Sequence, residues 1–264
     1  MDLSIIIVSY NHSDMLRKTL HSICTSKQSL DFEVFVVDNA SWEDNVKIIK
    51  EEFPQVKLIV NSKNLGFTHA NNQAMRRCQG DFILMLNPDV EVIDGSLNKL
   101  VEFMRHNPQA GAAGGRLLYP DGSLQMSCRN FYTLPTILLK RTFLKNMFPQ
   151  HKLVNRHLMS NWNHDNIRIV DWVFGACLIV RRRIIEELGF LDERFFMYFE
   201  DVDLCYRLKQ RGLKTYYVPQ ASFIHFHRRD SAKGLFNKRL IWHIKSMFQF
   251  YRKCCFLKTK GKLR

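Results

Sequence analysis

The first ninety residues alternate four times between a short apolar run and an amphipathic stretch. Each apolar run has the length and composition of a buried strand and ends at a polar or chain-breaking residue. The expected strands are residues 3–8, 32–37, 57–60 and 82–86, and the expected helices cover 13–24, a stretch ending at 51, and 68–78. Such alternation is typical of a parallel sheet with right-handed crossovers. We therefore expect an α/β protein with a mostly parallel central sheet flanked by helices.

Polar residues gather where these strands end. They are Ser9, Tyr10 and Asn11 after the first strand, Asp38 after the second, Asn64 and Gly66 after the third, and Asn87 and Asp89 after the fourth. Open α/β sheets bind ligands at this rim. Asp38 could accept hydrogen bonds from a base or a ribose, and Tyr10 could stack on a base. Asp89 could hold a hard divalent cation and, through it, a diphosphate, although Asn87-Pro88-Asp89 could also be only a turn.

The composition and the motifs exclude several classes of protein. No G-x-G-x-x-G follows the first strand and no P-loop motif occurs, which disfavours a Rossmann dehydrogenase and a P-loop NTPase. No run of about 18 apolar residues could span a membrane, and the first residues do not resemble a signal peptide. The seven cysteines lack zinc or redox spacing, which favours free thiols in a reducing cytoplasm. A net charge of +14 calls for an anionic partner: nucleic acid, nucleotide or lipid headgroups.

The second half of the chain is less regular. We expect a helix over residues 95–106, a close backbone approach at the glycine-rich residues 111–115, and a long functional insertion over residues 123–168. A buried strand returns over residues 170–180, where Gly175 suits a bulge or a closely bound ligand.

Three acids, Glu200, Asp201 and Asp203, fall within one turn where a helix is expected to begin. Acids in a first turn complement the helix dipole, and Asp203 can pair with Arg207 four residues on. The aromatic residues that precede them would also exclude water from the carboxylates, and such an environment prepares an acid for proton transfer. Both interpretations remain open from the residues alone.

Two histidines come with the last expected strands, which cover residues 214–218 and 222–226. The second strand brings His225 and then His227 near the rim where Asp89 is expected. A lone histidine is more often structural, but a histidine at a strand end near an aspartate is a reasonable metal ligand.

Six motifs, met in order, resemble those of the family-2 glycosyltransferases of the GT-A fold, and above all the bacterial rhamnosyltransferase-like members. The motifs cover residues 4–11, 36–41, 64–72, 86–89, 175–182 and 195–207. The resemblance extends over about residues 3–230. We therefore expect a GT-A catalytic domain over residues 1–230, with a nucleotide-sugar-binding half over 1–90 and an acceptor-binding and catalytic half over 91–230. A basic amphipathic tail would follow over residues 231–264.

The resemblance implies an enzyme that transfers a sugar with inversion from a nucleoside-diphosphate donor to a hydroxyl of a glycan or polyprenyl-linked acceptor in cell-surface polysaccharide synthesis. Rhamnose from dTDP-rhamnose is the favoured donor, with a UDP-sugar as the other possibility. The residues expected to bind the donor are Ser9, Tyr10, Asn11, Asp38, Asn64, Gly66, Phe67, Asn87, Asp89 and Gly175. The resemblance gives the family's Glu-Asp pair as Glu200-Asp201, with Asp201 as the base. It gives the family's Asp-x-Asp as Asn87-Pro88-Asp89, so one carboxylate, with His225, would hold Mg²⁺ or Mn²⁺.

The last thirty residues combine apolar residues at helical spacing with many basic ones. The apolar residues are Leu240, Ile241, Ile244, Met247, Phe248 and Tyr251. This pattern predicts an interfacial helix on an anionic membrane surface, where each basic residue adds about 1 kcal/mol. The alternative is a helix packed on the catalytic domain with a solvated basic end. We expect a cytoplasmic protein, peripheral on the inner face of the cell membrane.

Two other functions compete with the transferase. A nucleic-acid-binding protein would use the basic and aromatic residues that mix over 123–168. A sugar-phosphate nucleotidyltransferase would need a glycine-rich, basic loop after the first strand, and Ser9-Tyr10-Asn11 is not such a loop. We therefore expect no nucleic-acid partner.

Overall fold

The computed structural model describes residues 1–133, 135–136, 151–226 and 238–261. The strands are β1 (Leu3–Ser9), β2 (Phe32–Asp38), β3 (Lys57–Val60), β4 (Phe82–Leu86), β5 (Val90–Val92), β6 (Ala110–Leu118), β7 (Leu124–Gln125), β8 (Cys128–Arg129), β9 (Arg168–Val170), β10 (Trp172–Val173), β11 (Cys177–Arg181) and β12 (Lys214–His225). The helices are α1 (Ser13–Thr25), α2 (Asn45–Glu52), α3 (Phe67–Met75), α4 (Ser96–His106), α7 (Lys152–Leu158), α8 (Arg182–Glu187), α9 (Glu200–Gln210) and α10 (Lys238–Gly261).

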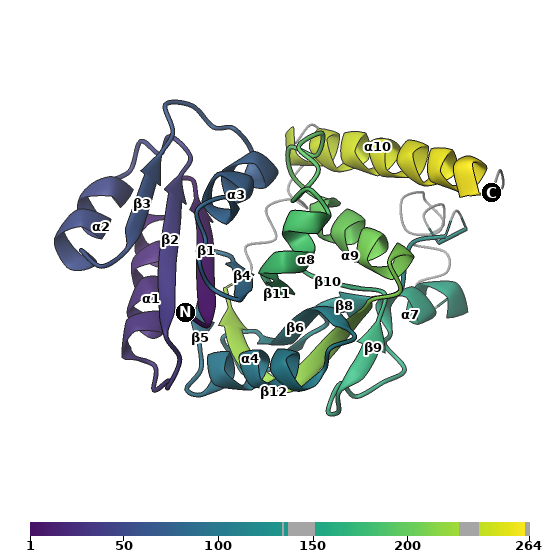
Figure 1. Ribbon diagram of the computed structural model, residues 1–264, viewed down its shortest axis with the longest axis horizontal. Helices are drawn as coiled ribbons and strands as arrows, with labels where there is room; N and C mark the ends of the chain where they lie inside the picture. Colours follow the sequence, from purple (N-terminus) through teal and green to yellow (C-terminus); the bar gives the residue numbers. More distant parts are fainter. Residues whose placement is uncertain (134, 137–150, 227–237, 262–264) are drawn as a thin grey trace.

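A ten-stranded sheet forms the centre of the molecule (Figure 1). Its strands follow the order β3-β2-β1-β4-β11-β6-β12-β5, with β7 beside β6 and β9 beside β12. Strands β1 to β4 are parallel, and β11 runs antiparallel to β4. Strand β5 lies at the far end of this order, although only residues 87–89 separate it from the central strand β4. The sheet is therefore bent back toward its own middle.

Helices cover both faces of the parallel half, as its sequence requires. Strand β1 is buried along its whole length, and successive side chains of a strand point to opposite faces. Ile5 packs in one core cluster with Leu16 of α1, whereas Ile6 packs in a second cluster with Ala70 of α3. Each buried isoleucine or leucine among them contributes about 1.5–3 kcal/mol. The four strands match the sequence expectation to within one residue at each end, which confirms the α/β architecture.

The second half departs from the expectation where glycine is frequent. Residues 111–115 belong to β6, a strand that the sequence did not reveal. A Cβ at Gly114 would lie 2.9 Å from the side chain of Val173, and one at Gly115 would lie 2.5 Å from the ring of Phe223. Glycine is therefore needed because neighbouring side chains pack directly on this backbone.

Two further strand expectations are corrected. The single strand expected over 170–180 is divided among three strands: Val170 ends β9, then comes β10, and β11 begins after a turn that contains Gly175. The two strands expected over 214–218 and 222–226 are one strand, β12, whose pairing with β6 is irregular between Val218 and Ser222.

The last helix, α10, packs along α9 and the segment that precedes it (Figure 1). Phe250 is buried between Phe199 and Tyr206, with ring centroids at 5.6 and 5.7 Å, and Ser246 donates to the Met197 carbonyl at 2.9 Å. The opposite side of α10 leaves Ile241, Ile244 and Phe248 exposed. Among the helices in the described part of the chain, none is long and apolar enough to cross a membrane.

Candidate active site

The carboxyl ends of β1 and β2 form one side of the candidate site. Ser9 and Asp38 are opposite each other in the parallel ladder. Asn45 donates to both, at 3.1 Å to Ser9 Oγ and at 3.0 Å to Asp38 Oδ1, and the Ser41 amide donates to Asp38 Oδ2 at 3.1 Å. Asp38 is buried, so its carboxylate holds the strand end and α2 together behind the rim.

Two aromatic side chains stand out from this rim. Tyr10 is 39% exposed and Trp42 is 78% exposed, and their rings meet edge to face with centroids 5.7 Å apart. The Trp42 amide donates to Asn11 Oδ1 at 3.0 Å, and the Asn11 amide donates to Ser41 Oγ at 2.9 Å, which fixes the two loops to each other. An exposed tryptophan held in this way is an available stacking surface. The sequence analysis did not single out Trp42. It could have been found as an aromatic residue in the loop that follows a strand of the parallel sheet.

The loop after β3 joins the rim to the acidic turn. Asn39, a buried residue that the sequence interpretation missed, donates to Asn64 Oδ1 at 3.0 Å and to the Gly66 carbonyl at 3.2 Å. The Phe67 amide donates to the Phe196 carbonyl at 2.8 Å. A Cβ at Gly66 would lie 2.6 Å from that same carbonyl oxygen, and Gly66 has a positive φ of 86°. Only glycine fits this contact.

Asp89 and His225 meet, as the sequence suggested, although they are far apart in the chain. Strand β12 pairs with β5, which places His225 opposite Val90, and the Phe226 amide donates to the Asp89 carbonyl at 2.9 Å. His225 Nε2 is 3.4 Å from Asp89 Oδ1. Burial acts to raise the pKa of Asp89, but the contact with His225, together with the charge of His12, makes the pKa lower than that of an ordinary aspartate. His227, the other candidate histidine, lies outside the described residues.

The chemistry of this pair suits a divalent cation. His225 Nδ1 is 2.6 Å from Gln125 Oε1. With that amide oxygen as acceptor, Nδ1–H is the donor and Nε2 is directed at the carboxylate, where a cation would take the place of a proton on Nε2, as in metal sites whose histidine is fixed by a second hydrogen bond. No group of three or more His, Cys, Asp or Glu side chains able to hold a metal occurs among the residues described. Asp89 and His225 would thus supply two ligands, with diphosphate and water oxygens completing the set.

Glu200 and Asp201 begin α9 and face Gly175. The Gly175 amide donates to Asp201 Oδ2 at 3.0 Å, and the Val202 amide donates to Oδ1 at 2.8 Å. Burial raises the pKa of Asp201 to about 6 despite these two donors. Burial, and then the charge of Asp201, raise the pKa of Glu200 well above its ordinary value. Glu200 therefore stays neutral where Asp201 is ionised, which gives the two carboxyl groups different chemistry.

The backbone before α9 is strained. Tyr198 and Phe199 both have φ of 68°, a left-handed conformation that bulky residues rarely adopt. Such strain persists only where the surroundings enforce it, and it concentrates at functional sites. Here Phe199 packs against Phe250 of α10 and against Tyr132.

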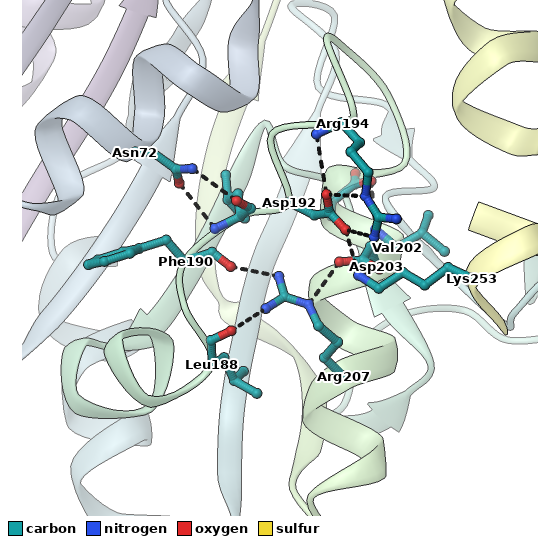
Figure 2. Close-up of polar contacts among 11 residues, drawn as sticks. Asn72, Leu188, Phe190, Asp192, Arg194, Val202, Asp203, Arg207 and Lys253 are labelled. Atoms are coloured by element: carbon teal, nitrogen blue, oxygen red, sulfur yellow. Dashed lines mark hydrogen bonds and ion pairs between the residues drawn. The ribbon is translucent and has the colours of Figure 1, made fainter. Parts of the chain in front are cut away.

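Asp203, the third acid of the turn, has a structural role: it binds basic side chains of two helices (Figure 2). It is fully buried and accepts a hydrogen bond from Arg207 Nε at 2.8 Å, the pair expected from the sequence. Arg207 also donates to the Leu188 and Phe190 carbonyls at 3.0 and 2.8 Å. Lys253 of α10 binds Asp203 as well, and it reaches Asp192 at 2.8 Å. The sequence could not reveal Lys253 because the contact spans fifty residues.

A backbone hydrogen bond links the connector that contains Asp89 to the turn that contains Gly175. The Asn87 amide donates to the Ala176 carbonyl at 3.0 Å, next to Gly175. This hydrogen bond connects the residue after β4 with the turn whose Gly175 amide binds Asp201. The arrangement places a possible cation ligand and a possible base at neighbouring points of one sheet edge.

Comparison with known proteins places these features in a family. The family described as Glycosyl transferase family 2 matches residues 4–189. The chain is 29% identical over 261 residues to the N-acetylglucosaminyl-diphospho-decaprenol L-rhamnosyltransferase of Mycobacterium tuberculosis, covering 94% of this chain and 83% of that protein. It is 28% identical over 258 residues to the rhamnosyltransferase WbbL of Escherichia coli K12, covering 93% of this chain and 91% of that protein.

Solved structures share the fold at lower identity. The structure of GalNAc-T7 with UDP, GalNAc and Mn²⁺ aligns with a TM-score of 0.65 and 17% identity, over 86% of this chain and 44% of that chain. The mannosyltransferase PcManGT of Pyrobaculum calidifontis, solved with GDP-Man and Mn²⁺, aligns with a TM-score of 0.59 and 19% identity, over 86% of this chain and 57% of that chain. The present chain thus spans less than two thirds of either solved chain. The sequence resemblance is confirmed: this chain belongs to glycosyltransferase family 2 and is a glycosyltransferase with the GT-A fold.

Proposed function

We propose that this glycosyltransferase transfers rhamnose from dTDP-rhamnose, with inversion, to a hydroxyl of a lipid-linked glycan acceptor in cell-surface polysaccharide synthesis. The observation that carries the proposal is the similarity to two rhamnosyltransferases over more than nine tenths of the chain, 94% and 93%. One of these relatives is named for an acceptor that joins N-acetylglucosamine to decaprenol through a diphosphate.

The donor nucleoside binds at the ends of the parallel strands. Its base stacks on Tyr10, and Trp42 offers a second aromatic surface beside it. Ser9, Asn11 and Asp38 fix the loops that form this surface. The adjacent wall of the donor site consists of Asn64, Gly66 and Phe67.

The donor diphosphate lies at Asn87 and Asp89. Asp89 and His225 hold Mg²⁺ or Mn²⁺ in this proposal, supported by their 3.4 Å approach and by the Gln125 contact behind the histidine. When bound, the ion neutralises the charge that develops on the departing nucleoside diphosphate. Asp89 is ready for this role because its pKa is lowered and the carboxylate stays ionised.

Asp201 is the base. It takes the proton from the acceptor hydroxyl while that oxygen attacks the anomeric carbon, and the nucleoside diphosphate leaves from the opposite face. The Gly175 and Val202 amides orient its two oxygens. Glu200 remains protonated beside it, so that Asp201 alone carries the negative charge of the pair.

Helix α10 attaches the enzyme to an anionic membrane surface, on the inner face of the cell membrane. Its outward side carries Ile241, Ile244 and Phe248, which are 60%, 42% and 63% exposed. The basic residues Lys245 and Arg252 are exposed on the same helix. Since the inner side of α10 is occupied by the catalytic domain, this apolar stripe is available for lipid.

Flotation with vesicles tests the attachment. A variant with serine at positions 241, 244 and 248 should lose binding to vesicles that contain anionic lipid yet melt like the parent, because these side chains are directed to solvent. Ile169→Ser is the matched control, since Ile169 is 52% exposed but lies on β9. Undiminished flotation of the triple variant would refute the membrane role of α10.

A panel of nucleotide sugars tests the transfer itself. The enzyme with Mg²⁺ should hydrolyse dTDP-rhamnose slowly in the absence of acceptor and should transfer rhamnose when a lipid-linked N-acetylglucosamine is added. Turnover of a UDP- or GDP-sugar and not of dTDP-rhamnose would replace the proposed donor.

A further inference from the structure

Three arginines on the acceptor half make their contacts with carbonyl groups and an aromatic ring. Arg116 of β6 donates to the His164 carbonyl at 2.8 Å, Arg129 of β8 donates to the carbonyl of Cys128 at 2.7 Å, and Arg168 of β9 lies over the ring of Trp162 at 5.1 Å. None of the three forms an ion pair with a carboxylate in the described parts of the chain. All three act on one buried histidine: burial lowers the pKa of His164, and their charges lower it further.

Arg129 contacts the residue that precedes the turn of the candidate base. Strand β8 pairs with β10, and the Arg129 guanidinium is 5.0 Å from the ring centre of Phe174. Phe174 is followed by Gly175, whose amide holds Asp201. One aromatic side chain therefore separates this cation from the turn that orients the base.

The environment of Arg129 favours an anion. Burial lowers the pKa of Arg129, although the guanidinium remains charged at neutral pH. A desolvated cation without a counter-charge is unfavourable, and a bound anion would compensate it.

Further hydrogen-bonding groups are available behind the arginines. Tyr217 and His164 are 0% and 1% exposed and pack against Trp162, with ring centroids 5.3 and 4.2 Å away. The Tyr217 hydroxyl, His164 Nε2 and Arg116 Nε make no hydrogen bond with good geometry within the described residues. Arg116 is nevertheless close enough to Tyr217 to lower its pKa, although burial prevails and raises it to about 12. The tyrosine thus stays a neutral potential donor.

We propose that Arg129, with Arg116 and Arg168 around it, binds a phosphate or diphosphate ester of the acceptor. The inference rests on the proposed transfer, in which the acceptor hydroxyl lies at Asp201. A phosphate ester could also belong to the donor, but the donor diphosphate is assigned to Asp89 at the end of β4. The Asn87–Ala176 bond and then Gly175 lie between that point and Phe174, so the base stands between two phosphate sites.

The first test compares two acceptors that differ only in the phosphate. One is a sugar joined to a lipid through a diphosphate, and the other is the alkyl glycoside of the same sugar. Arg129→Gln should raise the KM of the diphosphate acceptor about 10- to 100-fold, the usual range for a lost charge-assisted contact, with little change in kcat. The KM values of the alkyl glycoside and of the donor should not change. Arg129→Lys should raise this KM less than Arg129→Gln does, because lysine keeps the positive charge but lacks the paired N–H donors of the guanidinium.

A matched control removes an arginine elsewhere. Arg183 of α8 is 90% exposed and pairs with Glu187, so Arg183→Gln should behave like the parent. If Arg129→Gln proves unstable in a melting experiment, Arg168→Gln, at an exposed position, gives the same comparison. Equal KM increases for both acceptors, or an increase for the donor alone, would overturn the proposed site.

A binding experiment separates this inference from the proposed function. Decyl diphosphate is titrated calorimetrically into enzyme saturated with dTDP and Mg²⁺. The parent should bind it at least tenfold more tightly than Arg129→Gln. If the parent transfers no rhamnose but shows this difference, the function fails and the anion site stands. If the two proteins bind alike, or dTDP abolishes the binding, the anion site is wrong whatever the enzyme transfers.

Discussion

Replacing Lys253 by methionine should destabilise the enzyme by about 3 kcal/mol. Lys253 binds two carboxylates, of which Asp203 is completely buried and Asp192 is 14% exposed (Figure 2). Breaking a buried ion pair costs about 3–5 kcal/mol. We expect the lower end of that range because Asp203 keeps Arg207 and Asp192 keeps Arg194.

The expected change in melting temperature follows from the size of the protein. An unfolding entropy of about 2.1 cal/mol/K per residue gives about 0.55 kcal/mol/K for 264 residues, so 3 kcal/mol corresponds to about 5 °C. Calorimetry or circular dichroism measures it. Lys245→Met on the exposed side of the same helix is the control and should shift the melting temperature by less than about 1 °C.

The effect should depend on pH in a defined direction. Burial acts to raise the pKa of Asp192, but Arg194 and Lys253 hold it well below its ordinary value. The stabilisation is therefore complete above the pKa of an unfolded aspartate, about 3.9, and is lost as pH falls further. The gap between parent and Lys253→Met should narrow below about pH 4. Equal melting of the two proteins at pH 7 would show that Lys253 does not hold α10 to α9.

Four predictions concern the reaction and the binding of the donor nucleotide. Asp201→Asn should bind donor normally, melt near the parent temperature and transfer sugar at least about 100-fold more slowly; the assignment fails if Glu200→Gln gives that profile instead. Because the base must be deprotonated and its pKa is about 6, kcat of the parent should fall about tenfold per pH unit below that value. Asp89→Ala should abolish metal-dependent turnover while the fold persists, and full activity in EDTA would contradict this role. Asp38→Ala should weaken dTDP binding measured calorimetrically, by loosening the loop that carries Tyr10, and wild-type affinity would count against it.

The parallel half of the fold could be predicted because its signals are local. The strand from 82 to 86 lies between Gly80 and Pro88, and each boundary follows from one residue's backbone chemistry. Strand β6 could not be found in this way. Its glycines suggest a weak element in isolation, and they suit a strand only because Val173 and Phe223 pack on them.

The candidate site divides along the same line. Asp89, His225 and Asp201 could be proposed from strand ends and from resemblance. The residues that hold His225 and Asp203 in place could not be predicted, because Gln125 is one hundred residues from His225 and Lys253 is fifty residues from Asp203. The amphipathic pattern of the last residues predicts a helix but not which side of it is buried. In the structure Phe250 is buried and Phe248 is exposed. The packing of Phe250 against α9 determines this orientation, and the sequence of α10 alone does not contain it.

The short connector between β4 and β5 has a consequence for how this enzyme can diversify. Strands β4, β11, β6, β12 and β5 form a ring that Asn87-Pro88-Asp89 closes. An inserted or deleted residue there would shift β5 by one position against β12 and turn its side chains to the opposite face. Asp89 would then no longer lie beside His225. Insertions should therefore be tolerated far better in the loop around Trp42 than in this connector, and new substrate preferences should arise by changes of loop length there while the connector keeps three residues.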